Sequence, residues 1–364
     1  RAAGQEKAKH GRSKEKRSDC PLLTLGLVLD EQGFAKRSEV LEGNISEPKT
    51  LISMLDKLNA EEKKKKKRTV VVDAGIATEE NLKMLRERGY DYVCVSRSRA
   101  TVKFAGEEEM SLIKRKGDNI LEARLIKKEN ESLLHCRSTL RLAKEQQIKQ
   151  REQDAYEKRL QHIAASLKKK GGVKKYEKVL ERLARAKERF SSIAQFYQVE
   201  VERQGEIAQS IEWTCNDEQL EQRFSGEYII RTSRNDLSEK QIWSLYVMLN
   251  NVEAAFRSLK HELNLRPIFH VKQERSDAHL FIAVLAYHLL HAIQVKLHAK
   301  GIKLLWKTIR ERLASHVRVT TEMNTQKKQR LAIRHCSSPE HFHLSIYQAL
   351  GLPLKPLPVK RTIL

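Results

Sequence analysis

Apolar positions in the first hundred residues predict a pair of strands followed by a βαβ unit. The apolar run Leu22–Leu29 and the extended segment after its polar turn predict a hairpin or a meander. Leucines spaced for one helical face predict a helix over Ser46–Asn59. The β-branched run Val70–Val72 is typical of a central strand buried on both faces, and Thr78 then begins a helix that leads to a strand at Tyr90–Ser96. This alternation indicates an α/β fold with parallel pairing.

Residues 100–225 carry a more highly charged pattern. A strand is predicted at 131–138. Leucine and alanine then recur at three- and four-residue steps through 140–195, with a break at Gly171 and Gly172. This spacing predicts two helices packed as an antiparallel pair.

The last third of the chain returns to strands and long helices. The sequence FYQVEVE and residues 226–233 predict strands, and a helical block begins at Ser238 and continues through 277–313. The tail contains three prolines, which predict an extended conformation.

Composition narrows the class of protein. The 364 residues suffice for two domains, or for one domain with a large insertion, and 40 % apolar residues suffice for a sizeable core. Five cysteines without a C-x-x-C pair argue against a disulfide scaffold and a cysteine-type zinc ribbon. The longest apolar stretch, near Leu280–Ile293, is short and contains two histidines, so no transmembrane helix is predicted. Without an apolar signal segment, we expect a cytoplasmic protein.

The charge of the chain points to a polyanionic partner. A net charge of +23 favours nucleic acid, because neutralised phosphates release their counterions, although a merely basic soluble protein has the same balance. An anionic membrane surface is disfavoured, since no basic amphipathic helix with aromatic anchors is evident. The run EEKKKKKR at 61–68 is interpreted as a solvated loop, with a DNA contact as the alternative.

Two carboxylates are candidates for chemistry. Asp73 follows a predicted parallel strand at its carboxyl end, where α/β sheets place ligands; a turn or helix cap is the alternative. Glu253 borders the apolar face of a predicted helix, and an ordinary surface pair with Arg257 is the alternative. Two carboxylates from separate elements can share divalent metal ions in phosphodiester chemistry.

A family resemblance joins these residues. The segment with Tyr246, Leu249, Glu253 and Lys260 resembles the Y-x2-R-x3-E-x6-K signature of DDE transposases of bacterial insertion sequences. The neighbouring texts GEYIIRTS, FRSLKHELNLRPIFH and ERSDAHLFIAVLAYHLL are also similar to the family. Upstream, VVVDAGIATEENLKMLRERGYDYV resembles the family's core around its second catalytic aspartate. The resemblance covers most of the chain and is weakest in 140–215.

The resemblance implies a ribonuclease H-like α/β fold, in which a mixed sheet with flanking helices is interrupted by a large, partly helical insertion. We therefore expect the first part of the catalytic core at 1–127, the insertion at 128–225, the second part of the core at 226–315 and a C-terminal tail region at 316–364.

The resemblance also implies roles for single residues. Asp73 matches the second catalytic aspartate and Glu253 the catalytic glutamate, both as ligands of Mg²⁺ or Mn²⁺. Tyr246 and Lys260 match DNA-phosphate contacts, and Arg257, one turn after Glu253, is a further candidate; core packing is the alternative for Tyr246. Because positions 246, 253 and 260 are seven apart, nearly two helical turns each, we expect all three on one face of one helix.

Two positions depart from the family pattern. Leu249 occupies the position of the signature's arginine and cannot bind phosphate. The resemblance places the first catalytic aspartate upstream of Arg1, so the sequence is interpreted as short of one metal ligand, either as a truncated form of a longer protein or as the product of a decayed gene copy.

The predicted function is metal-dependent strand cleavage and strand transfer at insertion-sequence ends. The expected partners are transposon-end and target duplex DNA, bound by a homodimer in the bacterial cytoplasm and nucleoid. A non-catalytic DNA-binding remnant and a helical interaction protein built on 140–195 are the alternatives. Trp213 is a weaker candidate for stabilising a DNA hairpin, and His288 with His291 for a metal site; core packing is the alternative for all three.

Overall fold

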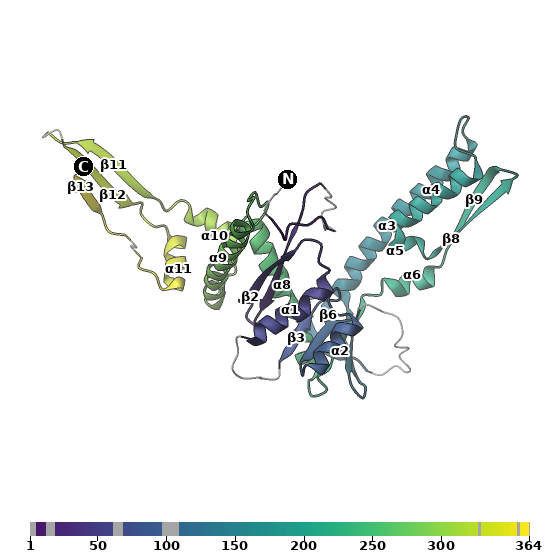
Figure 1. Cartoon of the computed structure of the whole chain (residues 1–364), viewed down its shortest axis with the longest axis horizontal. Helices are drawn as coiled ribbons and strands as arrows, with labels where there is room; N and C mark the ends of the chain where they lie inside the picture. Colours follow the sequence, from purple (N-terminus) through teal and green to yellow (C-terminus); the bar gives the residue numbers. More distant parts are fainter. Residues whose placement is uncertain are drawn as a thin grey trace. The chain divides into compact units, whose positions relative to one another are not determined.

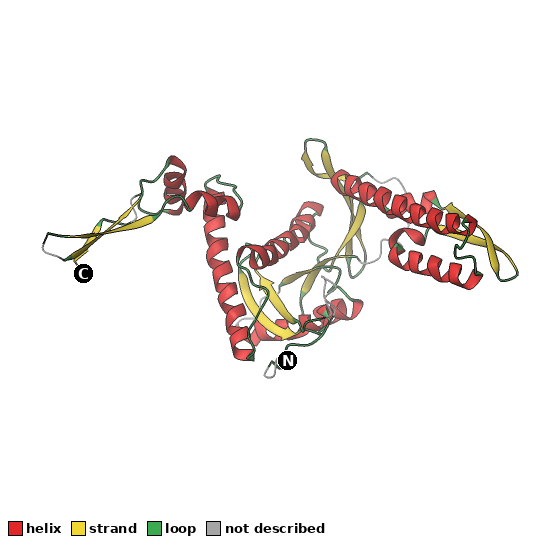
Figure 2. Cartoon of the chain, turned by 90° about the horizontal axis from the view of Figure 1, so that it is seen from above, coloured by secondary structure: helices red, strands yellow, loops and turns green. Residues whose placement is uncertain are grey.

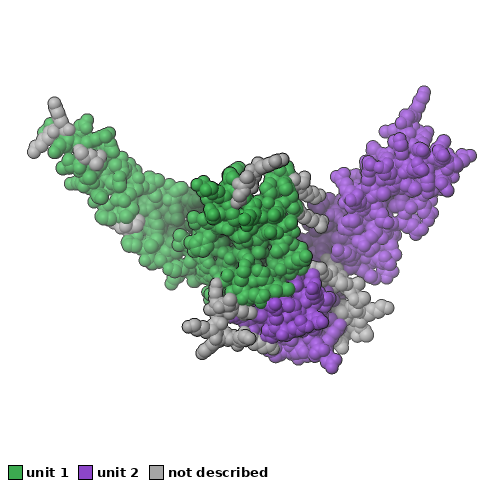
Figure 3. Space-filling view, in the orientation of Figure 1, with its two compact units in different colours: residues 1–65, 248–364 green, residues 66–247 purple. Residues whose placement is uncertain are grey.

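The protein consists of two compact units. The computed structural model describes residues 5–11, 19–60, 68–96, 109–326, 329–354 and 357–363. Unit 1 comprises residues 1–65 and 248–364, and unit 2 comprises residues 66–247 (Figure 3). The limits of these two units differ from the domain boundaries predicted after residues 127, 225 and 315, and those domain boundaries stay predictions. The predicted lysine-rich loop at 61–68 lies outside the described residues, apart from Arg68.

Unit 2 is built on a mixed six-stranded sheet in the order β3-β4-β10-β7-β6-β5. Strands are yellow and helices red in Figure 2. Its strands are β3 (Thr69–Val72), β4 (Asp91–Val95), β5 (Ser111–Lys116), β6 (Asn119–Lys127), β7 (Ser132–Ser138) and β10 (Glu227–Thr232). β3 and β4 pair in parallel, and the other pairs are antiparallel. The predicted βαβ unit is confirmed.

Helices cover both faces of this sheet. Helix α2 (Glu79–Glu87) follows β3, with the Thr78 side chain capping its first turn, and buries Leu82 and Leu85. Helix α7 (Glu239–Val247) contributes Ile242 to a core with Val93 and other residues of the opposite face. The arrangement is compatible with the ribonuclease H-like fold implied by the resemblance.

The position of β3 corrects one expectation. The β-branched run predicted a central strand, whereas β3 pairs only with β4 among the described residues and therefore lies at the sheet's edge. Only Val72 of its four residues is buried. The run still forms a strand because Val71 packs against the core beneath α7.

The second part of unit 2 has a core of its own. It contains α3 (Thr139–Lys168), α4 (Tyr176–Arg189), α5 (Ser191–Ala194), β8 (Tyr197–Gln204), β9 (Ile207–Cys215) and α6 (Asp217–Arg223). Figure 1 shows α3 and α4 side by side, as the break at Gly171 and Gly172 predicts. Leu160, Ile163 and Val179 are fully buried between these elements. Trp213 packs against this same core, which agrees with its packing interpretation.

Gly226 joins this part of unit 2 to β10, and its backbone conformation would be strained for alanine. Its φ is +74°, and an added Cβ would lie 2.8 Å from the backbone nitrogen of Leu142. Its own N–H donates to the buried carboxylate of Glu145 at 2.9 Å. We expect Gly226→Ala to lower the free energy of unfolding by about 2 kcal/mol, measured by chemical denaturation.

Gly205, in the turn between β8 and β9, is the matched control. It also has a positive φ, of +60°, but an added Cβ would meet nothing within 4 Å. We expect Gly205→Ala to lower the free energy of unfolding by only about 1 kcal/mol, the cost of the backbone conformation alone. Equal effects at the two positions would contradict the close approach at Gly226.

Unit 1 contains a hairpin, long helices and a second small sheet. Its elements are β1 (Leu23–Leu29), β2 (Ala35–Glu42), α1 (Glu47–Ala60), α8 (Leu249–Arg257), the π-helix η1 (Ser258–Glu262), α9 (Gln273–Ala299), α10 (Trp306–Leu313), β11 (Arg318–Asn324), β12 (Arg330–Cys336), α11 (His341–Leu350) and β13 (Lys360–Ile363). The predicted hairpin and first helix are confirmed. Leucines of β1 pack with α8, η1 and α9 in the core of this unit.

Helix α9 is long and apolar enough to cross a membrane, whereas the sequence analysis predicted no transmembrane helix. By length and composition it meets the criteria for a membrane-spanning helix, alone among the described helices. The core helix of a protein without membrane spans meets the same criteria, and α9 contributes Leu280, Ala283 and Tyr287 to the core of unit 1. Its length and composition are therefore weak evidence for a membrane span.

The C-terminal region forms more structure than its prolines predict. Strand β12 pairs with β11 on one side and with β13 on the other, both in antiparallel register. Helix α11 packs with α9 and α10 around Leu297, Ile309 and Ile346. Residues of β13 follow the prolines directly, so the extended tail ends as a strand of this sheet.

Candidate active site

Asp73 lies in unit 2, directly after the edge strand β3, and its side chain is exposed. Its Oδ1 accepts a hydrogen bond from the backbone N–H of Ile76 at 3.0 Å, and its carbonyl oxygen accepts from Ile76 and Ala77. The turn interpretation is therefore correct for one carboxylate oxygen. Among the described residues, none donates to Oδ2, which leaves that oxygen accessible for a ligand.

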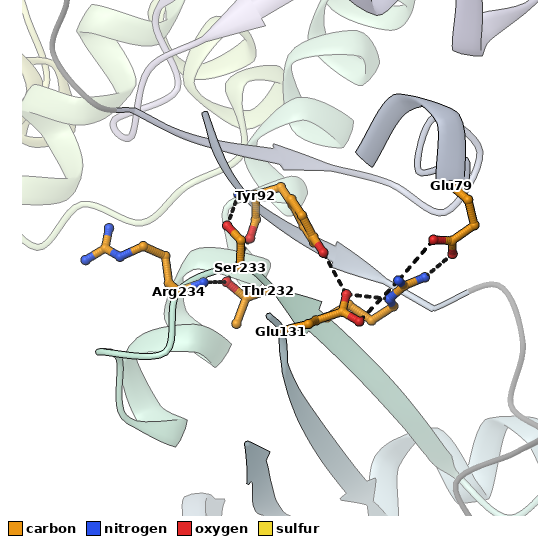
Figure 4. Close-up of polar contacts among 7 residues, drawn as sticks. Glu79, Tyr92, Glu131, Thr232, Ser233 and Arg234 are labelled. Atoms are coloured by element: carbon orange, nitrogen blue, oxygen red, sulfur yellow. Dashed lines mark hydrogen bonds and ion pairs between the residues drawn. The ribbon is translucent and has the colours of Figure 1, made fainter. Parts of the chain in front are cut away.

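A polar cluster fixes the start of α2, six residues after Asp73. Arg231 of β10 donates from Nε to Glu131 Oε1 at 2.7 Å and from Nη2 to Glu79 Oε2 at 3.3 Å. The hydroxyl of Tyr92 donates to the same Glu131 oxygen at 2.7 Å (Figure 4). One guanidinium thus ties the first residue of α2 to strands β10 and β4 and to the residue before β7.

The charges of this cluster stabilise one another. The hydrogen bond from Arg231 holds the pKa of Glu79 below its usual value, and the bond to Glu79 raises the pKa of the Arg231 guanidinium. Burial, assisted by the bond to Glu131, raises the pKa of the Tyr92 phenol. All three shifts keep the groups in the protonation states that they have at neutral pH.

Hydroxyl groups hold the end of β10 against β4. Thr232 Oγ1 donates to the carbonyl oxygen of Tyr92 at 2.7 Å, and Ser233 Oγ donates to Asp91 at 3.0 Å. The backbone N–H of Tyr92 in turn donates to Ser233 Oγ at 3.1 Å (Figure 4). These bonds fix β10 to β4, and β4 is the parallel neighbour of the strand that leads to Asp73.

Tyr246 lies on α7, also in unit 2. Its ring packs against Tyr228, with ring centroids 5.9 Å apart, and against the core that contains Val71. Core packing, the alternative interpretation of Tyr246, is what the structure shows. Val71 precedes Asp73 by two residues, so the core that holds Tyr246 also supports the strand leading to Asp73.

Glu253 lies in unit 1, on α8. Ala255 and Leu259 are fully buried and Phe256 packs beside them, as the apolar spacing predicts, whereas Glu253 is exposed. No ion pair joins Glu253 to Arg257, and neither side chain has a hydrogen bond to another described residue of unit 1. The ordinary surface-pair interpretation of Glu253 is therefore not observed.

The predicted single helix through 246, 253 and 260 is wrong. Helix α7 ends at Val247, Met248 separates it from α8, and Lys260 lies in the π-helix η1. A π-helix has wider turns than an α-helix, so steps of seven residues no longer return to one face. Tyr246 belongs to unit 2, while Glu253, Arg257 and Lys260 belong to unit 1.

The histidines of α9 support the hairpin turn rather than a metal site. His291 Nε2 lies 2.7 Å from the carbonyl oxygen of Gln32, and the ring of His288 stacks on Phe34 with centroids 6.0 Å apart. Tyr287 donates to the carbonyl oxygen of Gly33 at 2.7 Å. Within the described parts of the chain, no three His, Cys, Asp or Glu residues are grouped as metal ligands.

Asp73 of unit 2 and Glu253 of unit 1 each offer carboxylate oxygens, the donor type that a hard divalent cation prefers. Both are exposed carboxylates, and Mg²⁺ prefers oxygen ligands while retaining several waters. Few protein ligands are therefore needed for such an ion. Arg257 and Lys260 of the same helical segment as Glu253 supply positive charge suited to phosphate.

Sequence reasoning proposed Asp73 and Glu253 as candidates, which stay predictions, and it missed Arg231 and its two glutamates. The sequence did indicate this cluster in one way: Arg231 is a single arginine in the otherwise apolar strand sequence YIIRT, and a charged side chain there requires a partner.

Comparison with known proteins adds one match. A family model described as the transposase DDE domain matches residues 2–289. No curated protein and no solved structure matches the chain.

Proposed function

Because the chain belongs to the transposase DDE domain family, we propose that it cleaves and joins DNA strands at the ends of an insertion sequence. The observation that carries the proposal is the family match over residues 2–289, which includes both candidate carboxylates. The substrate is duplex DNA of the element ends and of the target, bound by a homodimer at the bacterial nucleoid.

In this proposal Asp73 and Glu253 hold a divalent cation, Mg²⁺ or Mn²⁺. The cation, when bound, polarises the phosphodiester and favours an oxygen nucleophile at neutral pH. Support comes from the exposure of both carboxylates and from their lack of an ion pair with the described residues of their own units. By resemblance, Glu253 occupies the glutamate position of the family signature, and Asp73 lies in the upstream segment that is similar to the family's core around its second aspartate.

The side chains around these carboxylates position the DNA. Arg257 and Lys260 bind phosphates close to the cleaved end, a role for which their charge and proximity to Glu253 in the chain suit them. The ring of Tyr246 packs against Tyr228. In this proposal the Tyr246 hydroxyl also contacts a DNA phosphate. Leu249 removes one cation of the family signature, so Arg257 takes over its share.

The protein expressed from its complete reading frame tests the proposal. Incubated with a supercoiled plasmid that carries the element and its flanks, it is expected to nick DNA at the element boundaries with Mg²⁺ and not with EDTA. Asp73→Asn is expected to remove nicking, while Asp118→Asn, in the turn between β5 and β6, retains it. DNA binding without metal-dependent nicking would contradict the proposal in favour of a DNA-binding remnant.

A further inference from the structure

The sheet of β11, β12 and β13 has a row of cations across one face. Directly paired residues of antiparallel strands point to the same side. The register pairs Thr320 with Arg334 and Arg334 with Lys360, so these three side chains form a row across the sheet. Arg318 precedes Thr320 by two residues and therefore shares this side, which we name the cationic face. It also carries Glu322, Asn324, Arg330, Ala332, Cys336 and Thr362.

The cationic face has an excess of unpaired positive charge. Its one acidic residue, Glu322, is neutralised by Arg330 at 3.0 Å. Arg334 donates from Nε to Thr320 Oγ1 at 3.0 Å, which orients its guanidinium without neutralising it. Within the parts of the chain that the structure describes, Arg318, Arg334 and Lys360 form no ion pair.

The charged side chains of this face are exposed, although Ala332 in its middle is buried and Cys336 at one end is half-buried. Every residue of β11 and of β13 is exposed, and so are Arg330 and Arg334 of β12. Arg318, Arg334 and Lys360 lie on the same side of the sheet, and three like charges repel one another unless an anion lies between them. The face is therefore suited to a ligand with several negative charges.

The two sides of the sheet differ in character. The opposite side carries apolar residues at most of its paired positions: Val319, Met323, Leu331, Ile333 and Ile363. Arg361 is the cation on that side. Because charge is concentrated on one side, the sheet presents a polar surface with hydrogen-bonding Thr320, Asn324 and Thr362 among the cations.

The sequence around the sheet reinforces the positive field. Residues 301–364 contain twelve lysines and arginines against three acidic residues. Duplex DNA is the polyanion that this protein meets in its proposed function, and its major groove admits a β-ribbon. Phosphates along the groove would meet the cations, and threonine and asparagine side chains add hydrogen bonds.

We propose that the cationic face of β11–β13 binds the phosphate backbone of duplex DNA. This surface lies outside residues 2–289, the part of the chain that matches the family, and is separate from Asp73 and Glu253. The inference rests on the proposed function only in taking DNA as the partner. It adds a second DNA-binding surface that the catalytic residues do not provide.

The test measures DNA affinity of the full chain. R318Q/R334Q/K360Q and the wild type are titrated with a short fluorescein-labelled duplex of mixed sequence, and anisotropy is followed between about 50 and 200 mM salt. The variant is expected to bind at least about tenfold more weakly at the lower salt concentrations. The slope of log K against log salt is expected to become shallower by about 0.9 for each phosphate that the variant no longer neutralises.

R361Q/K300Q/K303Q is the matched control. It removes the same charge, with Arg361 taken from the other side of β13 and both lysines from the segment between α9 and α10. Its affinity is expected to stay within about threefold of the wild type. An equal reduction in both triple variants would overturn the proposal, because the overall field and not this face would then govern binding.

A charge-conserving variant guards against misfolding. R318K/R334K/K360R is expected to retain affinity, and failure of this variant to bind would contradict the phosphate assignment.

If R318Q/R334Q/K360Q binds DNA as tightly as the wild type does, this inference fails and the proposed function stands. If the wild type binds no DNA, the proposed function fails as well. A changed mass in light scattering with unchanged DNA affinity would identify the face as a protein interface and overturn the proposal.

Discussion

Glu253→Gln is expected to reduce metal-dependent DNA cleavage at least about a hundredfold while DNA affinity stays unchanged. Glutamine has the same shape but lacks the negative charge that attracts a divalent cation. Because Glu253 is exposed and its helix is held by Ala255 and Leu259 on the other side, the fold does not depend on its carboxylate. Single-turnover cleavage of end-containing DNA, with anisotropy for binding, measures both quantities.

Glu274→Gln is the control for this prediction. Glu274 is an exposed glutamate in the first turn of α9, in the same unit as Glu253, and its substitution removes the same charge. We expect it to cleave at the wild-type rate. A Glu253→Gln protein that cleaves normally would refute the metal-ligand role, and one that loses cleavage and binding together would place Glu253 in the DNA interface instead.

Strands with a local apolar signal were predictable from the sequence. The runs that became β1, β4, β7 and β10 each contain mostly β-branched or apolar residues, which are buried in β4, β7 and β10 and half-buried in β1, so sequence pattern and structure agree. Strand β5 reads SLIKRK and is almost wholly exposed, so nothing in its pattern indicates pairing. It forms because a tight turn returns the chain onto β6.

The edge position of β3 and the break in the Glu253 helix were not predictable. A β-branched run is equally compatible with an edge strand and a central one, since pairing depends on residues far away in the chain. Met248 separates α7 from α8 with φ −59° and ψ −21°, a helical conformation without proline or glycine. No residue type in this segment marks the end of one unit and the start of the next.

Only those residues of the candidate site that belong to a recognisable sequence pattern could be predicted. The spacing of Glu253 and Lys260 matched a family signature, and Asp73 followed a recognisable strand. Arg231 contacts Glu131 and Glu79, which lie 100 and 152 residues away in the chain. Such a cluster depends on the tertiary fold, so sequence shows only that the arginine needs a partner.

Arg231→Met is expected to lower the free energy of unfolding by about 3 kcal/mol. The side chains of Arg231 and Glu131 are 19 % and 16 % exposed, so removing the guanidinium leaves a largely buried carboxylate without its cation. The hydroxyl of Tyr92 still donates to Glu131 and recovers only part of that stability. Urea denaturation at neutral pH measures the change, and Arg137→Met, which breaks an exposed pair with Glu227, is expected to change stability by less than about 1 kcal/mol.

The pH dependence of stability separates the charges of this cluster from its packing. Because Arg231 lowers the pKa of Glu79, Glu79 stabilises the folded state above its ordinary pKa, and that contribution disappears as the pH falls through the lowered value. Arg231→Met removes this cause, so its stability should fall less steeply with acidification than that of the wild type. Arg231→Met combined with Glu131→Gln should recover part of the stability, since no buried charge is then left unpaired. Equal destabilisation in the single and double variants, with pH profiles parallel to that of the wild type, would show that Arg231 acts through its aliphatic packing alone.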